Sequence, residues 1–273
     1  NAAPAGRVVV VADGTYTLSS PVSITNGIIV QGFNGAASTI VNGNGVTRCF
    51  KISHSNAVVT GFTIRNGSTT ANGGGVWIDR GGTLQNCTVS GNSAGNNRGG
   101  GGVYCSSGGV VRACTISGNT ATYGGGVQCD VAGTVSNCTI SGNTASFGGG
   151  IRLKSGGDAV NCLVNGNTAL AGGGGIQLFA AGTVQGCAIY GNSSSNAGGG
   201  VYCYQGGVVK DSAIYNNRAT QYGGGAQCEL GGTVSNCTVS GNQAPYGGGV
   251  RCKDGGSVLR CVITNNEARY GGG

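Results

Sequence analysis

The stretch YGGGVQCDVAGTVSNCTISGNTASFGGG, from Tyr123 to Gly150, is one unit of a repeat that determines the architecture of the chain. Two glycine triplets enclose two cysteines, Cys129 and Cys138, which lie nine positions apart. A period this regular indicates an array of similar structural units, each packed on its neighbours. The residue after each triplet recurs at intervals of 27, 24, 24, 25, 25, 25 and 24: Val76, Val103, Val127, Ile151, Ile176, Val201, Ala226 and Val250.

Within each unit apolar and polar residues alternate, which is the period of a β-strand. Val127 and Cys129 belong to one short strand, Val135 to a second, and Cys138 with Ile140 to a third. Helices are disfavoured because each glycine costs a helix about 1 kcal/mol relative to alanine. One unit cannot bury its apolar side alone, so the units are expected to stack in register with a rise of about 4.8 Å. The sequence therefore predicts an all-β parallel β-helix with three short strands in each coil of 24–25 residues.

Two further columns support stacking in register. A β-branched column suits a buried parallel sheet: Val89, Ile116, Ile140, Val164, Ile189, Ile214, Val239 and Ile263. Eight asparagines occupy one turn of every unit: Asn92, Asn119, Asn143, Asn167, Asn192, Asn217, Asn242 and Asn266. We expect this turn to need the left-handed conformation that asparagine tolerates, and the amides to form a hydrogen-bonded ladder.

The chain is expected to be a single solenoid. Residues 71–273 are the regular coils, and residues 1–70 supply an N-terminal cap and irregular first coils. The sequence stops as a ninth unit begins at Gly271. Because an unpaired strand edge is a template for association, we expect either that the natural chain continues or that this end stacks against another molecule, end to end or laterally.

Composition narrows the function classes. Only 8% of the residues are charged, and the net charge of +7 comes from basic residues that are spread singly along the chain. A nucleic-acid interface needs clustered basic side chains, so none is predicted. Mild attraction to acidic polysaccharide at a cell surface remains open. The longest purely apolar run, Val8–Ala12, is far too short to span a membrane.

Gly231–Asn242, GGTVSNCTVSGN, and its copies resemble the right-handed β-helix repeats of the pectin-lyase-like superfamily. The glycine-rich units also resemble the polymorphic outer-membrane and autotransporter-type repeats of bacterial surface proteins. The resemblance covers the chain from about Val8 to Gly273. It implies right-handed coiling, a secreted or cell-surface location, and adhesive or carbohydrate-related work, but that superfamily holds enzymes and non-catalytic adhesins alike.

Most of the 13 cysteines fall into two columns. Nine-residue spacing does not suit a zinc site, so no metal and no cofactor is predicted. Positions that accept leucine or cysteine behave as small apolar packing sites, which predicts buried, mostly reduced thiols. Disulfides between neighbouring coils remain the alternative. The columns are Cys87, Cys114, Cys138, Cys162, Cys187, Ser212, Cys237 and Cys261, and Ile78, Cys105, Cys129, Leu153, Leu178, Cys203, Cys228 and Cys252.

Any functional site should lie where the units differ, on the outward side of the first strand, which we expect to be a solvated face. Its first row is Trp77, Tyr104, Gln128, Arg152, Gln177, Tyr202, Gln227 and Arg251. Its second row is Asp79, Ser106, Asp130, Lys154, Phe179, Tyr204, Glu229 and Lys253.

Two kinds of site are candidates on this face. Asp79 and Asp130 lie two coils, or about 10 Å, apart, which is marginal for an inverting glycosidase, and Arg152 with Lys154 could serve a lyase. Alternatively, aromatic side chains could form a platform for sugar rings: Trp77, Tyr104, Tyr202 and Tyr204.

The leading prediction is a non-catalytic extracellular structural or adhesive segment of a bacterial surface or fibre-forming protein. The alternatives are a polysaccharide-active lyase or hydrolase, and a carbohydrate-binding β-helix.

Overall fold

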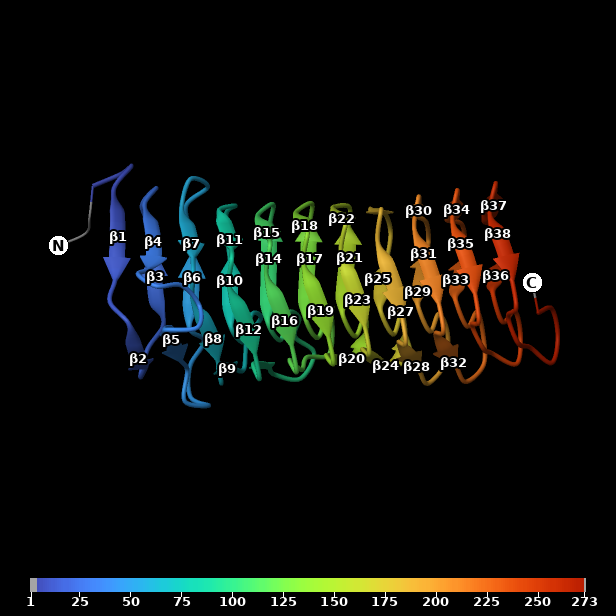
Figure 1. Ribbon diagram of the computed structural model, residues 1–273, viewed down its shortest axis with the longest axis horizontal. Helices are drawn as coiled ribbons and strands as arrows, with labels where there is room; N and C mark the ends of the chain where they lie inside the picture. Colours follow the sequence, from blue (N-terminus) through green and yellow to red (C-terminus); the bar gives the residue numbers. More distant parts are fainter. Residues whose placement is uncertain (1–3, 273) are drawn as a thin grey trace.

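The computed structural model describes residues 4–272, which form 38 short β-strands and no helix. The strands stack into an elongated solenoid whose coils follow one another along a single axis (Figure 1). No helix that could cross a bilayer occurs within these residues. The all-β prediction is therefore confirmed.

Three long parallel sheets run the length of the rod. Sheet A has 11 strands: β1 (Val8–Val11), β4 (Ile29–Gly32), β7 (Val58–Thr60), β11 (Thr83–Gln85), β15 (Val110–Arg112), β18 (Thr134–Ser136), β22 (Asp158–Val160), β26 (Thr183–Gln185), β30 (Val208–Lys210), β34 (Thr233–Ser235) and β37 (Ser257–Leu259). Sheet B has 11 strands: β2 (Gly14–Thr17), β5 (Thr39–Asn42), β8 (Thr63–Arg65), β12 (Thr88–Ser90), β16 (Thr115–Ser117), β19 (Thr139–Ser141), β23 (Leu163–Asn165), β27 (Ala188–Tyr190), β31 (Ala213–Tyr215), β35 (Thr238–Ser240) and β38 (Val262–Thr264).

Sheet C carries the first strand of each repeat. It has 10 strands: β3 (Val22–Ile24), β6 (Phe50–Ile52), β10 (Val76–Ile78), β14 (Val103–Ser107), β17 (Val127–Val131), β21 (Ile151–Ser155), β25 (Ile176–Leu178), β29 (Val201–Tyr204), β33 (Ala226–Glu229) and β36 (Val250–Lys253). Residues one repeat apart pair directly, as Val127 does with Val103 on one side and Ile151 on the other. The predicted coil of three strands, and its register, are confirmed.

A fourth set of very short strands was not predicted. It comprises β9 (Ser68–Thr69) with β13 (Ser93–Ala94), and β20 (Thr144–Phe147), β24 (Thr168–Gly172), β28 (Ser193–Ser194) and β32 (Arg218–Ala219). Isolated bridges such as Ser93 with Thr120 continue this ladder. These strands have two to five residues each, too few to show a periodic signal in the sequence.

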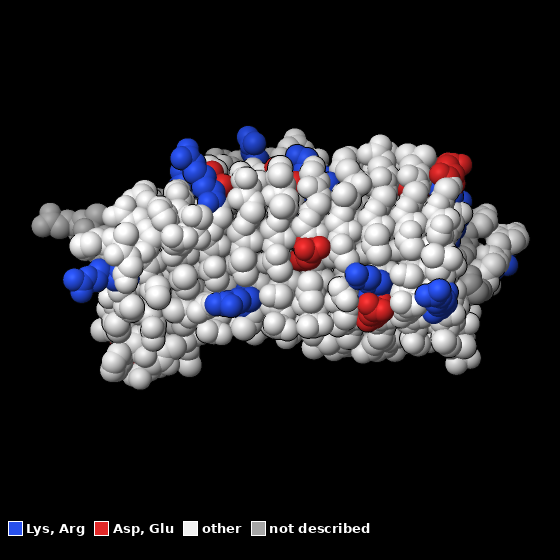
Figure 2. Space-filling view, turned by 90° about the horizontal axis from the view of Figure 1, so that it is seen from above, with Lys and Arg blue, Asp and Glu red and all other residues white. Residues whose placement is uncertain are grey.

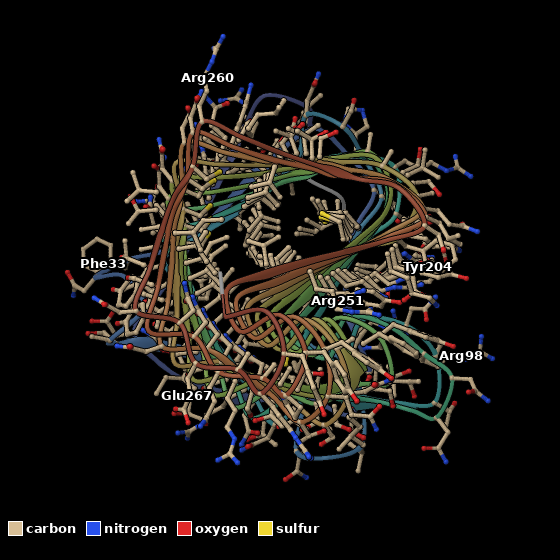
Figure 3. All side chains as sticks on the ribbon, turned by 90° about the vertical axis from the view of Figure 1, so that its right-hand side faces the viewer. Phe33, Arg98, Tyr204, Arg251, Arg260 and Glu267 are labelled. Atoms are coloured by element: carbon tan, nitrogen blue, oxygen red, sulfur yellow. The ribbon has the colours of Figure 1, made fainter. Side chains whose placement is uncertain are left out.

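The inward residues of sheets A, B and C fill the interior of the rod, as the view along its axis shows (Figure 3). The predicted β-branched column is fully buried from Val89 to Val239, and only Ile263 in the last coil is partly exposed. Figure 2 shows that charged groups are few on one face of the rod and lie singly or beside a group of opposite charge, with wide uncharged surface between them. This distribution agrees with the spread of basic residues in the sequence.

The asparagine ladder is confirmed. The backbone N–H and the side-chain Nδ2 of Asn143 both donate to Oδ1 of Asn167, each at 3.0 Å, and Nδ2 also donates to the carbonyl of Ile116 at 3.0 Å. The same pattern repeats from Asn92 to Asn266. The expected left-handed conformation was placed wrongly, since it falls on the preceding residue, such as Gly142 with φ 61°.

The first three coils share sheets A, B and C with the later coils, although their sequence is irregular. Residues 4–7 form an exposed turn before β1. The cap predicted for the first residues includes residues 1–3, which lie outside the described part of the chain, and it stays a prediction.

The burial of the cysteines is confirmed for 11 of the 13, with Cys261 half-buried and Cys252 exposed, and all 13 are free thiols. The cysteines in the column of Cys138 do more than fill apolar space, because their Sγ atoms also form hydrogen bonds. Cys138 Sγ donates to the carbonyl of Ser136 at 3.2 Å and accepts a hydrogen bond from the backbone N–H of Cys114 at 3.5 Å. Ser212 Oγ makes the same pair of bonds, to Lys210 O at 2.8 Å and from Cys187 N at 3.1 Å. The column therefore selects a side chain that both donates and accepts.

Thiol labelling tests this burial. Hydrogen bonding with neighbouring thiols and burial raise the pKa of Cys138 and Cys162 to about 12, and burial raises that of Cys252 to about 11. A raised pKa keeps the thiol protonated and unreactive at pH 8. We expect at most two of the 13 thiols to react with maleimide in the native chain, and all 13 after denaturation.

The pH dependence adds a second check. Below a pKa of about 11 the thiolate fraction rises about tenfold per pH unit, so the labelling rate of Cys252 should rise accordingly between pH 8 and 10. Cys252→Ser is the control, since it should remove one reactive thiol and no more. Fast labelling of several thiols in the native chain would contradict the buried columns.

Candidate ligand-binding face

The first row of outward residues on sheet C is covered, contrary to the prediction of a solvated face. Six of its members, from Tyr104 to Gln227, are at most 8% exposed. The segment between the asparagine ladder and the next glycine triplet folds back over this row. The ring of Tyr123, for example, lies 4.4 Å from the Arg152 guanidinium carbon. Figure 3 shows Arg251 between the closed core and this outer segment, with Tyr204 at the open side.

The second row lies at the open edge of that covered layer. The Asp130 and Lys154 side chains are 22% and 44% exposed. Side chains from both rows and from the covering segment therefore meet at an accessible edge, where two similar polar clusters occur.

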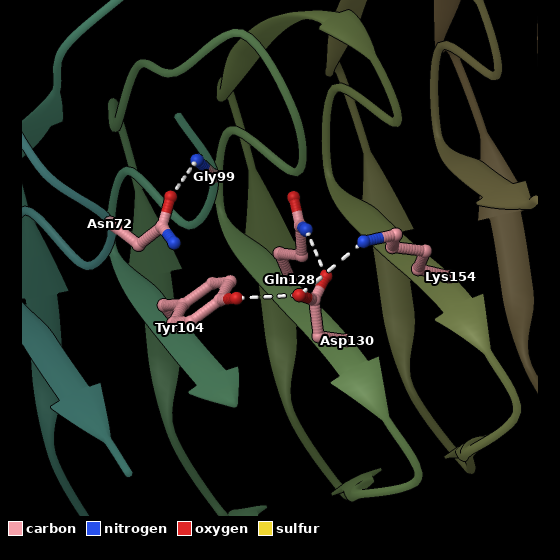
Figure 4. A network of polar contacts seen from close by, with 6 residues as sticks. All are labelled: Asn72, Gly99, Tyr104, Gln128, Asp130 and Lys154. Atoms are coloured by element: carbon pink, nitrogen blue, oxygen red, sulfur yellow. Dashed lines mark hydrogen bonds and ion pairs between the residues drawn. The ribbon is translucent and has the colours of Figure 1, made fainter. Parts of the chain in front are cut away.

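Site 1 spans three successive strands of sheet C: β14, β17 and β21 (Figure 4). The Tyr104 hydroxyl donates to Asp130 Oδ2 at 2.6 Å, and Gln128 Nε2 donates to Oδ1 at 2.7 Å. Lys154 Nζ lies 3.5 Å from Asp130 Oδ2. A cavity of about 260 Å³ adjoins this cluster and is lined by Asn72, Asn97, Arg98, Gly99, Tyr104, Tyr123, Gln128, Asp130, Arg152 and Lys154.

Arg152 is the most deeply buried cation of site 1. Its guanidinium lies 4.4 Å from the ring centre of Tyr123 and 5.1 Å from that of Phe179, and its Nε donates to Gln177 Oε1 at 2.7 Å. Burial lowers the pKa of Arg152 below its ordinary value. Burial and the hydrogen bond to Asp130 raise the pKa of Tyr104, so its hydroxyl stays a donor at neutral pH.

Site 2 repeats this arrangement on β29, β33 and β36. The Tyr202 hydroxyl donates to Glu229 Oε2 at 2.8 Å, and Lys253 Nζ donates to Oε1 at 2.9 Å. The Arg251 guanidinium carbon lies 4.4 Å from the ring centre of Tyr222. The adjoining cavity of about 200 Å³ is lined by Asn196, Ala197, Tyr202, Tyr222, Glu229, Arg251 and Lys253.

The carboxylate of site 2 is held ionised by its neighbours. Burial alone would raise the pKa of Glu229, but hydrogen bonds from Lys253 and Tyr202 outweigh it, so the pKa is lowered. The group is therefore an acceptor, and no proton is available from it at neutral pH.

The two sites reveal a longer repeat of four coils. A comparison of each coil with the next one does not detect it. Six residues of site 1 have a counterpart of the same or similar type 98 or 99 positions later, four coils along the rod. The pairs are Tyr104 and Tyr202, Tyr123 and Tyr222, Gln128 and Gln227, Asp130 and Glu229, Arg152 and Arg251, and Lys154 and Lys253. Comparing coils four apart would have identified Glu229, Arg251 and Lys253 as site residues.

The predicted acid pair lies two coils apart, as expected from the repeat. Asp79 follows β10 and Asp130 lies on β17, with β14 between them. Asp130 is instead engaged by Tyr104, Gln128 and Lys154. Within residues 4–272 no group of three or more histidine, cysteine or acidic side chains is placed to hold a metal ion.

The four residues of the predicted aromatic platform do not form one surface. Tyr104 and Tyr202 are buried, and their hydroxyls bind the acids of sites 1 and 2. Tyr204 lies at the edge against Phe179, with ring centres 5.4 Å apart. Trp77 lies in an earlier coil, where Lys51 Nζ is 4.5 Å from its ring centre. The role of these four residues in ligand binding stays a prediction.

Comparisons with known proteins address the fold. The family model described as "Right handed beta helix region" matches residues 9–193. Neither the search of curated proteins nor the search of solved structures found a match.

Proposed function

Because this chain belongs to the right-handed β-helix family, we propose that it is a non-catalytic, exported segment that acts as a stiff stalk and adheres to polysaccharide. The observation that carries the structural half is the unbroken ladder from Asn92 to Asn266, which joins each coil to the next inside the rod. Buried hydrogen bonds that continue from coil to coil make bending and local opening costly.

The adhesive half is supported by the edge of sheet C. Sites 1 and 2 there combine cations, a carboxylate and aromatic rings in small polar cavities. The resemblance of the repeats to those of bacterial surface proteins supports a location outside the cell. Cell-surface polysaccharide is the partner that this location and these sites fit.

A lyase or hydrolase is less well supported. Catalysis by paired acids needs two carboxyls across one bond, and an inverting pair is separated by about 6.5–9.5 Å. One strand lies between Asp79 and Asp130, which puts their backbones about 10 Å apart and the pair at the margin of that range. The carboxylate of Asp130 also already accepts two hydrogen bonds. Glu229, held ionised, is no general acid at neutral pH.

Binding and turnover distinguish these functions. The purified chain is expected to be retained on at least one surface coated with acidic polysaccharide, and to release neither reducing ends nor unsaturated products from acidic or neutral glycans. Asp79→Ala and Asp130→Ala are the matched controls. If products form and either variant abolishes their formation, the chain is an enzyme. If the chain binds none of the polysaccharides tested, the adhesive half of the proposal is wrong.

A further inference from the structure

We propose that the outward side of sheet B is an interface through which two copies of this chain pair side by side, as parallel rods related by a two-fold axis. The inference goes beyond the proposed function and does not depend on it. It is carried by the lack of charge on the strands from β12 to β38, by an apolar centre with a hydroxyl border, and by the area of the face.

Sheet B is the long sheet whose outward side is uncharged over most of the rod. Each of its eight strands from β12 to β38 has two outward residues, and none of these is charged. Sheet A instead has Arg112, Asp158 and Lys210 on its outward side, and sheet C has the ions of sites 1 and 2. Because a two-fold interface brings the same patch together from both copies, a charge near the axis would meet its own kind. Two copies with a net charge of +7 each can therefore approach most closely through sheet B.

The centre of this face is apolar. In β23, β27 and β31 the outward threonine of the coils on either side is replaced by Leu163, Ala188 and Ala213. On the last two of these strands the other outward residue is Tyr190 or Tyr215, and the two rings are stacked with centres 4.9 Å apart and an angle of 5° between their planes. An apolar centre that holds tyrosines inside a polar border is the usual anatomy of a protein–protein interface.

The two tyrosines and the two alanines give the face a shape that fits itself. The stacked rings form a ridge, and Ala188 and Ala213, two positions earlier on the same strands, leave a trough beside it. A two-fold axis parallel to the rod exchanges the two sides of the face, so the ridge of each copy lies over the trough of the other. An axis across the rod would instead put ridge against ridge. The shape therefore selects parallel rods with their coils level.

The border of the face consists of hydroxyl side chains. Thr115 and Ser117 lie on one side of the apolar centre, Thr238 and Ser240 lie on the other, and all four are half-buried or exposed. A hydroxyl both donates and accepts hydrogen bonds, so a row of hydroxyls can pair with the identical row of a second copy. The border is therefore as self-complementary as the centre.

The area of the face is sufficient for a specific pair. Each coil presents the stretch between two exposed corners, such as residues 137–142, which spans about 17 Å at the usual rise per residue of a strand. Eight strands at the usual separation span about 34 Å. The resulting area of about 600 Å² on each copy gives about 1,200 Å² in total, above the ~1,000 Å² expected of a biological interface.

Sedimentation equilibrium of the whole chain over a range of concentrations tests the pairing. We expect a reversible dimer, and Ala188→Lys should weaken it by about 100-fold or more, because the two-fold axis brings two ammonium groups into one apolar centre. Ala188 is half-buried and faces outward, so the lysine can reach water in the single chain. An unchanged urea midpoint checks that this variant folds.

Thr183→Lys is the matched control, because Thr183 is an outward, half-buried residue of sheet A in the same coil. It should leave the dimer unchanged. Tyr215→Ser adds no charge and introduces the residue type of its neighbour Ser240, and it should weaken the dimer about tenfold or more. The inference is wrong if the chain stays monomeric at the highest concentration reached, if both lysine variants weaken the dimer equally, or if the chain associates in a way that Ala188→Lys leaves intact.

The parallel arrangement has its own test. Ser90→Cys, at one end of the face, places the new thiols of two parallel copies at the same level, so a short bis-maleimide should join them. Cys252→Ser in the same chain removes the exposed native thiol. Antiparallel rods would keep the two thiols about 34 Å apart, so a dimer that does not cross-link would overturn the parallel axis. Polysaccharide binding enters none of these measurements, so the inference can fail while the proposed function stands.

Discussion

Asn167→Ala is expected to lower the free energy of unfolding by about 3–5 kcal/mol, since each buried polar group left unpaired costs about 1–3 kcal/mol. Asn167 Nδ2 donates to the carbonyls of Ile140 and Asn165 and to Asn192 Oδ1. Its own Oδ1 accepts from both the backbone N–H and Nδ2 of Asn143. Alanine removes all of these bonds in the middle of the rod, where water does not reach.

Asn165→Ala is the matched control, two residues away in the same coil. Asn165 is half-buried, and its side chain makes one hydrogen bond, from Nδ2 to the Tyr190 hydroxyl at 2.8 Å. Its loss should cost about 1 kcal/mol. Urea unfolding gives both free energies, and amide exchange locates the loss. Similar urea midpoints for the two variants would show that the ladder contributes little.

Gly125→Ala is expected to cost about 3 kcal/mol or more, the upper range for overpacking an interior site. A Cβ at this position would lie 2.5 Å from the Thr144 carbonyl oxygen and 2.6 Å from that of Gly149. Both are backbone atoms of the next coil, so no side chain can move aside. The coil of Gly125 and the next coil would have to separate.

Gly142→Ala separates this contact effect from backbone strain. Gly142 has φ 61° but open space around its Cα, so alanine there meets only the left-handed penalty of about 1–2 kcal/mol. Thermal and urea unfolding of both variants provide the comparison. A cost at Gly125 no larger than that at Gly142 would show that the coils do not pack as closely as the structure indicates.

The sequence predicted the coil, the strand columns and the ladder because each of these signals is repeated about eight times. A single alternation such as that of Val127 and Cys129 is weak evidence, but its recurrence in register is strong. The hydrogen-bonding role of the first cysteine column could also have been predicted, because Ser212 occupies one of its positions and a purely apolar position would not accept a hydroxyl.

The covered first row could not be predicted from the repeat. Whether Arg152 faces water depends on where the segment around Tyr123 runs, and that path is set by glycine conformations outside the three main strands. Tyr104, Asp130 and Lys154 were named as candidates, but their grouping into one site was missed for a second reason. Each site needs a tyrosine, an acid and a lysine from three successive coils, a relation that no single unit contains.

This dependence on three coils makes the number of units part of the binding chemistry. In a solenoid, the folding stability is roughly a sum of contacts between neighbouring units, so an extra unit can be inserted almost anywhere without destabilising the fold. Between β25 and β29 such an insertion would lengthen the distance between the two cavities by about 4.8 Å and leave each intact. Between β14 and β21 it would separate Tyr104 from its acid or the acid from Lys154. The spacing of the two sites can therefore change only in steps of one coil, and only by insertions that fall between the sites and not within one of them.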